Sequence, residues 1–197
     1  MAKQYEKQSL ALLFHENTKK INGFAEFDTN IQYKIYPNAY SIDLDEYYNK
    51  YELLEDELFN TILRRKSIRI WDDEGIQLND LAMLLRLSCG KRLLQDDERF
   101  ECRTYASAGA RYPIEVYPVI LRSKEMKLGI YHYNLFKNSL ELVKKGNFSE
   151  EIHEFYGNQP FGNQPPCIIF FSMMFERTMS KYGERGYRFM LIDAGHI

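Results

Sequence analysis

A nearly continuous apolar run at residues 167–174 constrains the fold of this chain more than any other feature. It follows a short tandem duplication, Gly-Asn-Gln-Pro at 157–160 and again at 162–165, which we interpret as a loop. An apolar run of this length after a loop is typical of a strand buried on both faces. It is far too short to cross a membrane. We therefore predict a central, buried strand in the last quarter of the sequence.

Helical and extended patterns alternate around this run, and their order predicts an α+β fold. Residues 21–50 are rich in tyrosine and asparagine and only weakly periodic, so we expect an irregular N-terminal arm there. Asn79 is the expected N-cap of a helix that Gly90 ends. The expected helices cover about 5–20, 53–65, 79–90, 150–156 and 184–197, and the expected strands cover 114–121, 129–134 and 139–143. The chain then divides into a helix and arm over 1–50 and one domain over 51–197.

Charge and cysteine content narrow the class of ligand. The chain has 26 Lys and Arg residues against 28 Asp and Glu residues, so a net charge of -2 gives no overall nucleic-acid or membrane footprint. Its basic residues are clustered locally, which favours a discrete anionic ligand. The three cysteines are widely spaced and residues 1–10 lack a signal-peptide core, so we expect reduced thiols and a cytoplasmic location. The four histidines lack zinc-site spacing, and no metal site is expected.

The segment 64–69 gathers four cations and one hydroxyl: Arg64, Arg65, Lys66, Ser67 and Arg69. Guanidinium groups form paired, charge-assisted hydrogen bonds with phosphate, and a serine hydroxyl adds a neutral one. The alternative is a solvated basic helix end, where cations suit the helix dipole. Arg69 lies beyond the expected end of the helix and, in an extended segment, on the same side as Ser67, which favours an anion site.

A turn of small residues, Ser107, Ala108 and Gly109, precedes the first predicted strand of the domain. Glycine permits positive φ and removes side-chain bulk, so a flat ligand can lie against the backbone. An ordinary tight turn before a strand explains the same residues. The segment lacks the glycine spacing of dinucleotide-binding and P-loop motifs.

Lys181 and Tyr182 bring an amine and a phenol together in sequence. Both groups move protons or steady an anion when a cofactor lies nearby. A surface lysine beside a half-buried tyrosine is the alternative. The pair, the turn at 107–109 and the cationic segment together suggest a phosphorylated, planar redox cofactor.

Five motifs occur in an order that resembles the nitroreductase-like flavoproteins, and most closely the SagB-type azoline dehydrogenases. They are Arg-Arg-Lys-Ser-Ile-Arg (64–69), Ser-Ala-Gly-Ala-x-Tyr-Pro-x-Glu-x-Tyr (107–117), Gly-Ile-Tyr-His-Tyr (129–133), Lys-Tyr-Gly-x-Arg-Gly-Tyr-Arg-Phe (181–189) and Asp-Ala-Gly-His-Ile (193–197). Each motif is weak alone, but five in one order are specific.

The resemblance implies a mixed sheet flanked by helices and a homodimer with FMN at its interface. It implies that Arg64, Arg65, Ser67 and Arg69 hold the FMN phosphate and ribityl chain, and that Ser107, Ala108 and Gly109 line the flavin. It assigns catalysis to Lys181 and Tyr182, without ranking the two. The implied reaction oxidises thiazolines or oxazolines of a ribosomally made precursor peptide, after a cyclodehydratase complex has formed the rings.

Two features depart from the family pattern. Arg111 stands where an apolar residue is usual, and it could contact substrate or flavin or face solvent. The family sequence continues beyond the Gly-His-Ile motif, so we expect an incomplete nitroreductase-like domain whose C-terminal part is missing. A general NAD(P)H-dependent nitroreductase and a non-catalytic scaffold of the azole synthetase remain as alternatives.

Overall fold

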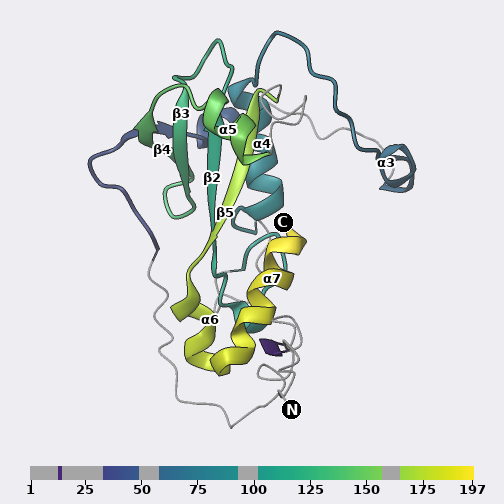
Figure 1. Cartoon of the computed structure of the whole chain (residues 1–197), viewed down its shortest axis with the longest axis vertical. Helices are drawn as coiled ribbons and strands as arrows, with labels where there is room; N and C mark the ends of the chain where they lie inside the picture. The colour runs from purple at the N-terminus through teal and green to yellow at the C-terminus, as the bar shows by residue number, and fades with distance from the viewer. Residues whose placement is uncertain (1–12, 15–32, 49–57, 93–101, 157–164) are drawn as a thin grey trace, which may run out of the picture.

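A five-stranded sheet with helices at its faces and one end forms the body of the computed structural model, which describes residues 13–14, 33–48, 58–92, 102–156 and 165–197 (Figure 1). The strand order is β1-β4-β3-β2-β5. The strands are β1 (Tyr40–Asp43), β2 (Ile114–Ile120), β3 (Gly129–Asn134), β4 (Ser139–Lys145) and β5 (Cys167–Met173). The helices are α2 (Asp45–Tyr48), α3 (Leu58–Arg64), α4 (Leu78–Cys89), α5 (Ser149–Phe155), α6 (Phe175–Tyr182) and α7 (Gly186–His196), with 3-10 turns η1 (Ala108–Ala110) and η2 (Gly183–Arg185). The α+β prediction is confirmed.

All four strand pairings in the described part of the chain are antiparallel, whereas the resemblance implied a mixed sheet. The antiparallel arrangement follows from the way in which consecutive strands are connected. β3 and β4 are joined by a tight turn in which Asn138 takes a positive φ of 47°, and such short turns join only antiparallel strands. β5 returns beside β2 with Ile114 opposite Met173 and Ile120 opposite Cys167.

The strand at 167–173 exists, but its predicted central position is wrong for the described strands. β5 follows β2 at the end of the strand order, and most of its side chains are only partly buried. Phe171 is 39% exposed. A continuous apolar run does not distinguish a central strand from an edge strand whose outer side contacts another chain.

Helix α4 covers one face of the sheet. Its buried Leu81 and Leu85 pack in one core cluster with Ile114 and Ile120 of β2. The helix ends where predicted, at Gly90, but Asn79 is not its N-cap. Instead the Leu78 amide donates to the Glu125 carboxylate over 2.6 Å, so a side chain from a distant turn caps the helix.

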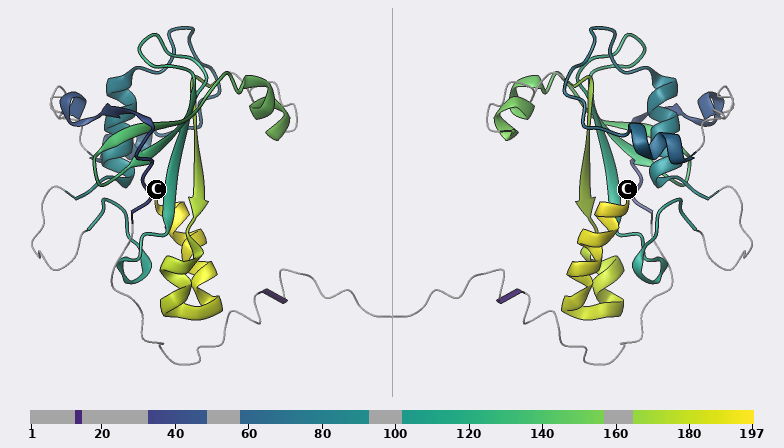
Figure 2. Two further views of the ribbon diagram at one scale, coloured as in Figure 1. Left: turned by 90° about the vertical axis from the view of Figure 1, so that its left-hand side faces the viewer. Right: turned by 90° about the vertical axis from the view of Figure 1, so that its right-hand side faces the viewer.

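The C-terminal helical region is longer than predicted and consists of two helices. α6 and α7 pack against each other beyond the end of β5 (Figure 2). Gly183 separates them with φ 57° and ψ -150°, a conformation that only glycine adopts easily. A Cβ at Gly186 would lie 3.1 Å from the Met179 backbone, so this glycine admits the close approach of the two helices.

The N-terminal region holds structure that the weak periodicity did not predict. β1 pairs with β4, and Leu44 beside it is 1% exposed in the main core cluster. Within the helix predicted at 5–20 only residues 13–14 are described, and they are helical. Of the helix predicted at 53–65, residues 58–64 are helical and 53–57 lie outside the described residues. No helix of the described part has the length and apolarity needed to cross a membrane.

Candidate functional site

The turn at 107–110 and the Lys181–Tyr182 pair meet at Gly109. A Cβ on Gly109 would lie 2.4 Å from the Tyr182 hydroxyl oxygen and 2.6 Å from the Lys181 side-chain nitrogen. Both distances are far below ordinary contact, so both polar groups occupy the space that a side chain would fill. Gly109 itself has φ 60° and is exposed. The structure therefore brings together two of the three segments that the sequence singled out.

Asp193 of α7 holds the turn in place. Its carboxylate accepts a 2.6 Å hydrogen bond from the Ser107 hydroxyl and a 3.3 Å bond from the Ala108 amide. The Ser107 oxygen in turn accepts a 2.8 Å bond from the Tyr112 amide. The hydroxyl proton of Ser107 is thus committed to Asp193, which is 2% exposed. The sequence marked Asp193 only as part of a motif and gave it no role.

Two buried arginines join the turn to α6. Arg111 donates from Nε to the Arg177 carbonyl over 2.7 Å, and Arg177 donates from Nη1 to the Tyr112 carbonyl over 3.1 Å. Arg111 is 6% exposed and therefore neither faces solvent nor lies open to a ligand. The unusual residue at position 111 thus has a structural explanation: it fixes the strand side of the turn against α6.

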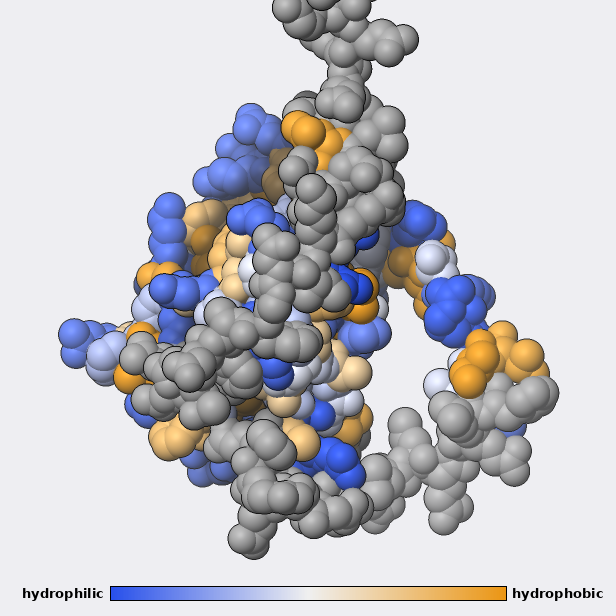
Figure 3. All heavy atoms as spheres, turned by 90° about the horizontal axis from the view of Figure 1, so that it is seen from below, coloured by the Kyte–Doolittle hydropathy of each residue, from blue (hydrophilic) through white to orange (hydrophobic). Residues whose placement is uncertain are grey.

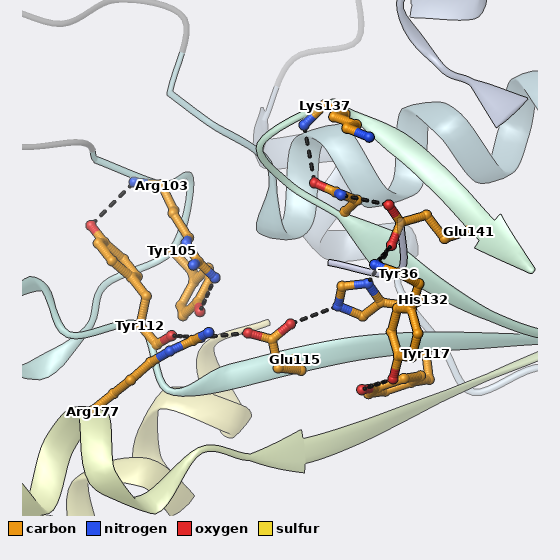
Figure 4. Close-up of polar contacts among 11 residues, drawn as sticks. Tyr36, Arg103, Tyr105, Tyr112, Glu115, Tyr117, His132, Lys137, Glu141 and Arg177 are labelled. Carbon is orange, nitrogen blue, oxygen red and sulfur yellow. Dashed lines mark hydrogen bonds and ion pairs between the residues drawn. The ribbon is translucent and has the colours of Figure 1, made fainter. Parts of the chain in front are cut away.

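A buried charge chain continues from Arg177 into the sheet (Figure 4). Arg177 Nη1 lies 2.5 Å from Glu115 Oε1, and Glu115 Oε2 lies 2.7 Å from His132 Nε2. His132 Nδ1 lies 3.4 Å from Glu141 Oε2, and Asn134 donates to the other Glu141 oxygen over 2.7 Å. All of these side chains are buried. We call Arg177, Glu115, His132 and Glu141 the buried charge chain.

The electrostatic balance at Glu115 favours its ionised form. Burial raises the pKa of this carboxyl, but the hydrogen bond from His132 and the charge of Arg177 outweigh burial. The net result is a pKa below the ordinary value of 4.5. Two cysteines show the opposite effect: burial raises the pKa of Cys89 to about 11 and that of Cys167 to about 12, so these thiols remain protonated and unreactive.

The cationic segment 64–69 lies elsewhere. Arg64, Arg65, Ser67 and Arg69 are all exposed, and Figure 1 shows α3 standing off the body, away from the end of the sheet where α6 and α7 pack. Seen from below, the same region forms a lobe beside the body in which hydrophilic and hydrophobic residues adjoin (Figure 3). Within one chain, the structure does not bring the arginines to the turn at 107–110.

An open groove of about 500 Å³ runs along the start of α6. Its lining is mainly apolar and comprises Met173, Met174, Phe175, Glu176, Met179 and Ser180. The Lys181–Tyr182 pair follows these residues directly in α6. Among the described residues no three His, Cys, Asp or Glu side chains gather in a way that could hold a metal ion.

The chain belongs to the nitroreductase family, whose family model matches residues 62–197. It is 26% identical over 146 residues to MJ1384 of Methanocaldococcus jannaschii, a protein named as a nitroreductase, covering 74% of this chain and 71% of that protein. It is 35% identical to the trifolitoxin-processing protein TfxB of Rhizobium leguminosarum bv. trifolii over 96 residues, and 31% identical to the microcin B17-processing protein McbC of Escherichia coli over 101 residues. These matches cover 46% and 48% of this chain, and 26% of TfxB and 37% of McbC.

Solved structures have the same fold. A chain from Anabaena variabilis named as a nitroreductase superposes with a TM-score of 0.72 at 25% identity, covering 96% of this chain and 37% of that chain. A chain of the E. coli microcin synthetase McbBCD complex, with truncated pro-MccB17 bound, superposes with a TM-score of 0.54 at 22% identity. That match covers 95% of this chain and 73% of that chain and concerns the fold alone.

Proposed function

We propose that this chain supplies the flavin site and the proton-transfer pair of an FMN-dependent dehydrogenase that oxidises azoline rings in a peptide to azoles. The observation that carries the proposal is the convergence of the Lys181 amine and the Tyr182 phenol on the open turn at Gly109. The similarity to TfxB and McbC, both named for processing a peptide product, supports a peptide substrate. The five sequence motifs support the same dehydrogenase class.

The residues present fit FMN in two respects. The exposed guanidinium groups of Arg64, Arg65 and Arg69, with the Ser67 hydroxyl, suit a terminal phosphate. The turn at Ala108 and Gly109 offers the ring exposed backbone beside the Lys181 amine and the Tyr182 phenol, which fill the space at the missing side chain of Gly109. When bound, FMN supplies the hydride acceptor that ring oxidation needs.

The Lys181–Tyr182 pair supplies the proton transfer. Aromatising an azoline removes one proton from carbon and one hydride from the neighbouring atom. Either Lys181 or Tyr182 takes the proton, with the other as its hydrogen-bond partner. The apolar groove lies along the start of the same helix, at Met174 and Phe175, and suits an uncharged part of the peptide.

The active form in this proposal is a homodimer. The cationic segment and the turn at 107–110 lie apart in one chain, so a single FMN can use both when they come from two copies. The exposed Phe171 on the edge strand β5, and the exposed Ile62 and Leu63 on α3, provide apolar surface for such contacts. The further partners in this proposal are the precursor peptide and a cyclodehydratase complex, as the resemblance to the SagB-type dehydrogenases implies. We also propose a cytoplasmic location, where the three unpaired cysteines stay reduced.

The test is direct. The full-length protein is purified and its flavin absorbance recorded, and azole formation is then assayed with an azoline-bearing precursor peptide for the native chain and for Lys181→Ala. We expect the variant to retain FMN and to lose ring oxidation by at least about 100-fold. Full activity of Lys181→Ala, or a native protein that cannot retain FMN, overturns the proposal.

A general NAD(P)H-dependent nitroreductase is the second candidate. The match to MJ1384, named as a nitroreductase, covers more of this chain than the matches to TfxB and McbC. Steady turnover of a nitroarene with NADPH, unaffected by Lys181→Ala, would favour this function. A colourless protein that binds the cyclodehydratase would favour the scaffold instead.

A further inference from the structure

Two sequence motifs contain residues to which the proposed chemistry assigns no role. Glu115 belongs to the motif at 107–117 and His132 to the motif at 129–133. In the structure these two residues are hydrogen-bonded to each other over 2.7 Å inside the sheet. His132 is 1% exposed and Glu115 is 7% exposed. Charged groups this deeply buried are costly unless they are paired, so their pairing calls for an explanation.

We propose that Glu115 and His132 are positioning residues that act through Arg177 to hold α6, and with it Lys181 and Tyr182, against the turn at 107–110. This inference rests on the proposed function of the Lys181–Tyr182 pair. It assigns the two residues no contact with substrate or flavin. Their effect passes through the hydrogen bond between His132 and Glu115 and the ion pair between Glu115 and Arg177.

Arg177 is the link between the sheet and the helix. Its Nη1 atom binds both Glu115 Oε1 at 2.5 Å and the Tyr112 carbonyl at 3.1 Å. Its own carbonyl accepts the 2.7 Å hydrogen bond of Arg111. One residue of α6 is therefore tied to β2 and to the end of the turn segment at the same time.

Lys181 follows Arg177 by four residues in α6. Residues four apart in a helix lie above one another on the same side, about one turn along the axis. A shift or rotation of α6 at Arg177 therefore displaces the Lys181 amine by a similar amount. The Lys181 amine already occupies the space beside Gly109. A small shift of α6 therefore changes the position of the amine relative to the turn.

His132 fixes the orientation of Glu115. Its Nε2 lies against Glu115, and its Nδ1 faces Glu141 at 3.4 Å. Glu115 uses one oxygen for His132 and the other for Arg177. Removing its charge leaves the buried guanidinium of Arg177 without this carboxylate.

The chain offers a matched control in Glu141. Glu115→Gln and Glu141→Gln each remove one buried carboxylate beside His132, and each keeps the side-chain size. Only Glu115 contacts Arg177, whereas Glu141 binds Asn134 and the Tyr36 amide at the other end. A loss of stability should therefore appear in both variants. A displacement of α6 should appear only in Glu115→Gln.

The experiment has two arms on full-length protein. The first measures amide hydrogen exchange in peptides covering 107–113 and 175–182, which requires no substrate. The second measures kcat and KM for azoline oxidation at saturating FMN. For Glu115→Gln we expect exchange about 10-fold faster in both segments and kcat about 10-fold lower, with KM and FMN affinity within about 3-fold. For Glu141→Gln we expect exchange in these segments and kcat within about 3-fold of the native chain, despite a comparable loss of thermal stability.

Each outcome decides the inference. Equal effects of the two variants on kcat and on exchange in 175–182 overturn it, as does native kcat in Glu115→Gln. If Glu115→Gln does not fold, Arg177→Lys takes its place, because it keeps the charge but its nitrogen ends one bond short of Nη1, the atom that reaches both Tyr112 and Glu115. If the native protein oxidises no azoline, the proposed function fails, while the exchange arm still decides whether Glu115 holds α6.

Discussion

Gly109 and Tyr182 lie so close that a β-carbon on residue 109 would be 2.4 Å from the phenolic oxygen. The Lys181 nitrogen would be 2.6 Å from the same β-carbon. The glycine is therefore required by the amine and the phenol themselves. The resemblance assigned Gly109 to the lining of the flavin. The structure adds a second reason for a glycine at this position, because the amine and the phenol occupy the space of a side chain.

Gly109→Ala tests this contact. The left-handed conformation of residue 109, with φ 60°, itself strains an alanine by about 1–2 kcal/mol. A steric effect is added, so Lys181 and Tyr182 must move. We expect a loss of about 1–3 kcal/mol in the free energy of unfolding and a larger relative loss of azoline oxidation than of FMN affinity.

Gly195→Ala in α7 is the control for this prediction. Apart from its chain neighbours and the backbone of its own helix, no atom of the described residues lies within 4 Å of a β-carbon placed there, and alanine is the better helix former by up to about 1 kcal/mol. We expect its stability and activity to equal or exceed those of the native chain. Native activity in Gly109→Ala would show that the pair does not depend on this space.

Ser107→Ala removes the hydroxyl between Asp193 and the Tyr112 amide. It leaves a buried carboxylate with one fewer donor and a backbone amide without its acceptor. We expect chemical denaturation to show a loss of about 1–3 kcal/mol. Ser172→Ala, an exposed serine on β5, should change the unfolding free energy by less than about 0.5 kcal/mol. Equal values for the two variants would show that Asp193 does not hold the turn.

Acid stability should depend on Glu115. Its pKa lies below 4.5 in the folded protein because His132 and Arg177 outweigh burial, and Lys34 and Arg103 line the same small cavity. The unfolded chain binds a proton at this carboxyl at higher pH than the folded chain does. The contribution of Glu115 is therefore complete above pH 4.5 and is lost as the pH falls through the lower, folded pKa.

The measurement is the free energy of unfolding from pH 7 down to about pH 3. Below pH 4.5 we expect Glu115→Gln to show a shallower decline than the native chain. Glu176→Gln, which removes an exposed glutamate of α6, should decline as the native chain does. If the free energy of unfolding of Glu115→Gln fell with pH as steeply as that of the native chain, the Glu115 carboxyl would not be ionised preferentially in the folded state.

Local patterns predicted the elements whose burial follows a regular period. The strand β3, the strand β4 and the end of α4 at Gly90 all lie close to their predicted positions. α6 was missed because its apolar residues at helical spacing, Phe175, Met179 and Tyr182, are not the ones that it buries. Its buried side includes Arg177 and Thr178, and a buried cation is recognisable only when its partner Glu115 is known.

The sequence singled out residues that lie together in the structure, but it did not predict the hydrogen bonds that hold them there. Resemblance and residue chemistry both singled out Gly109, Lys181 and Tyr182, and these do converge. The role of Asp193 was not predicted because its partner Ser107 lies 86 residues away in the sequence. The hydrogen bond of Glu115 to His132 likewise joins two strands. Pairings of this kind depend on sheet register, which local propensity does not determine.

Arg69→Gln tests the cationic segment. Losing one charge-assisted hydrogen bond to phosphate costs about 1.5–3 kcal/mol, so the Kd of FMN should rise by about 10- to 100-fold in a flavin fluorescence titration. Riboflavin lacks the phosphate, and its affinity should not change. Lys145→Gln, an exposed cation of β4, should leave both affinities unaltered. An unchanged FMN affinity in Arg69→Gln would remove the segment from the flavin site.

Mixing Arg69→Gln with Lys181→Ala, at an FMN concentration that fills native sites but not those of Arg69→Gln, tests whether one FMN uses two chains. In a dimer of Arg69→Gln with Lys181→Ala, one site receives both defects if the segment and the pair come from different copies, and the other site receives neither. Random reassociation should then restore about 25% of native activity, because half of the dimers are mixed and each has one intact site. If both elements came from the same copy, every site would carry one defect and no activity would return. A mixture of Arg65→Gln with Arg69→Gln should restore nothing in either arrangement, since both changes lie in the same segment.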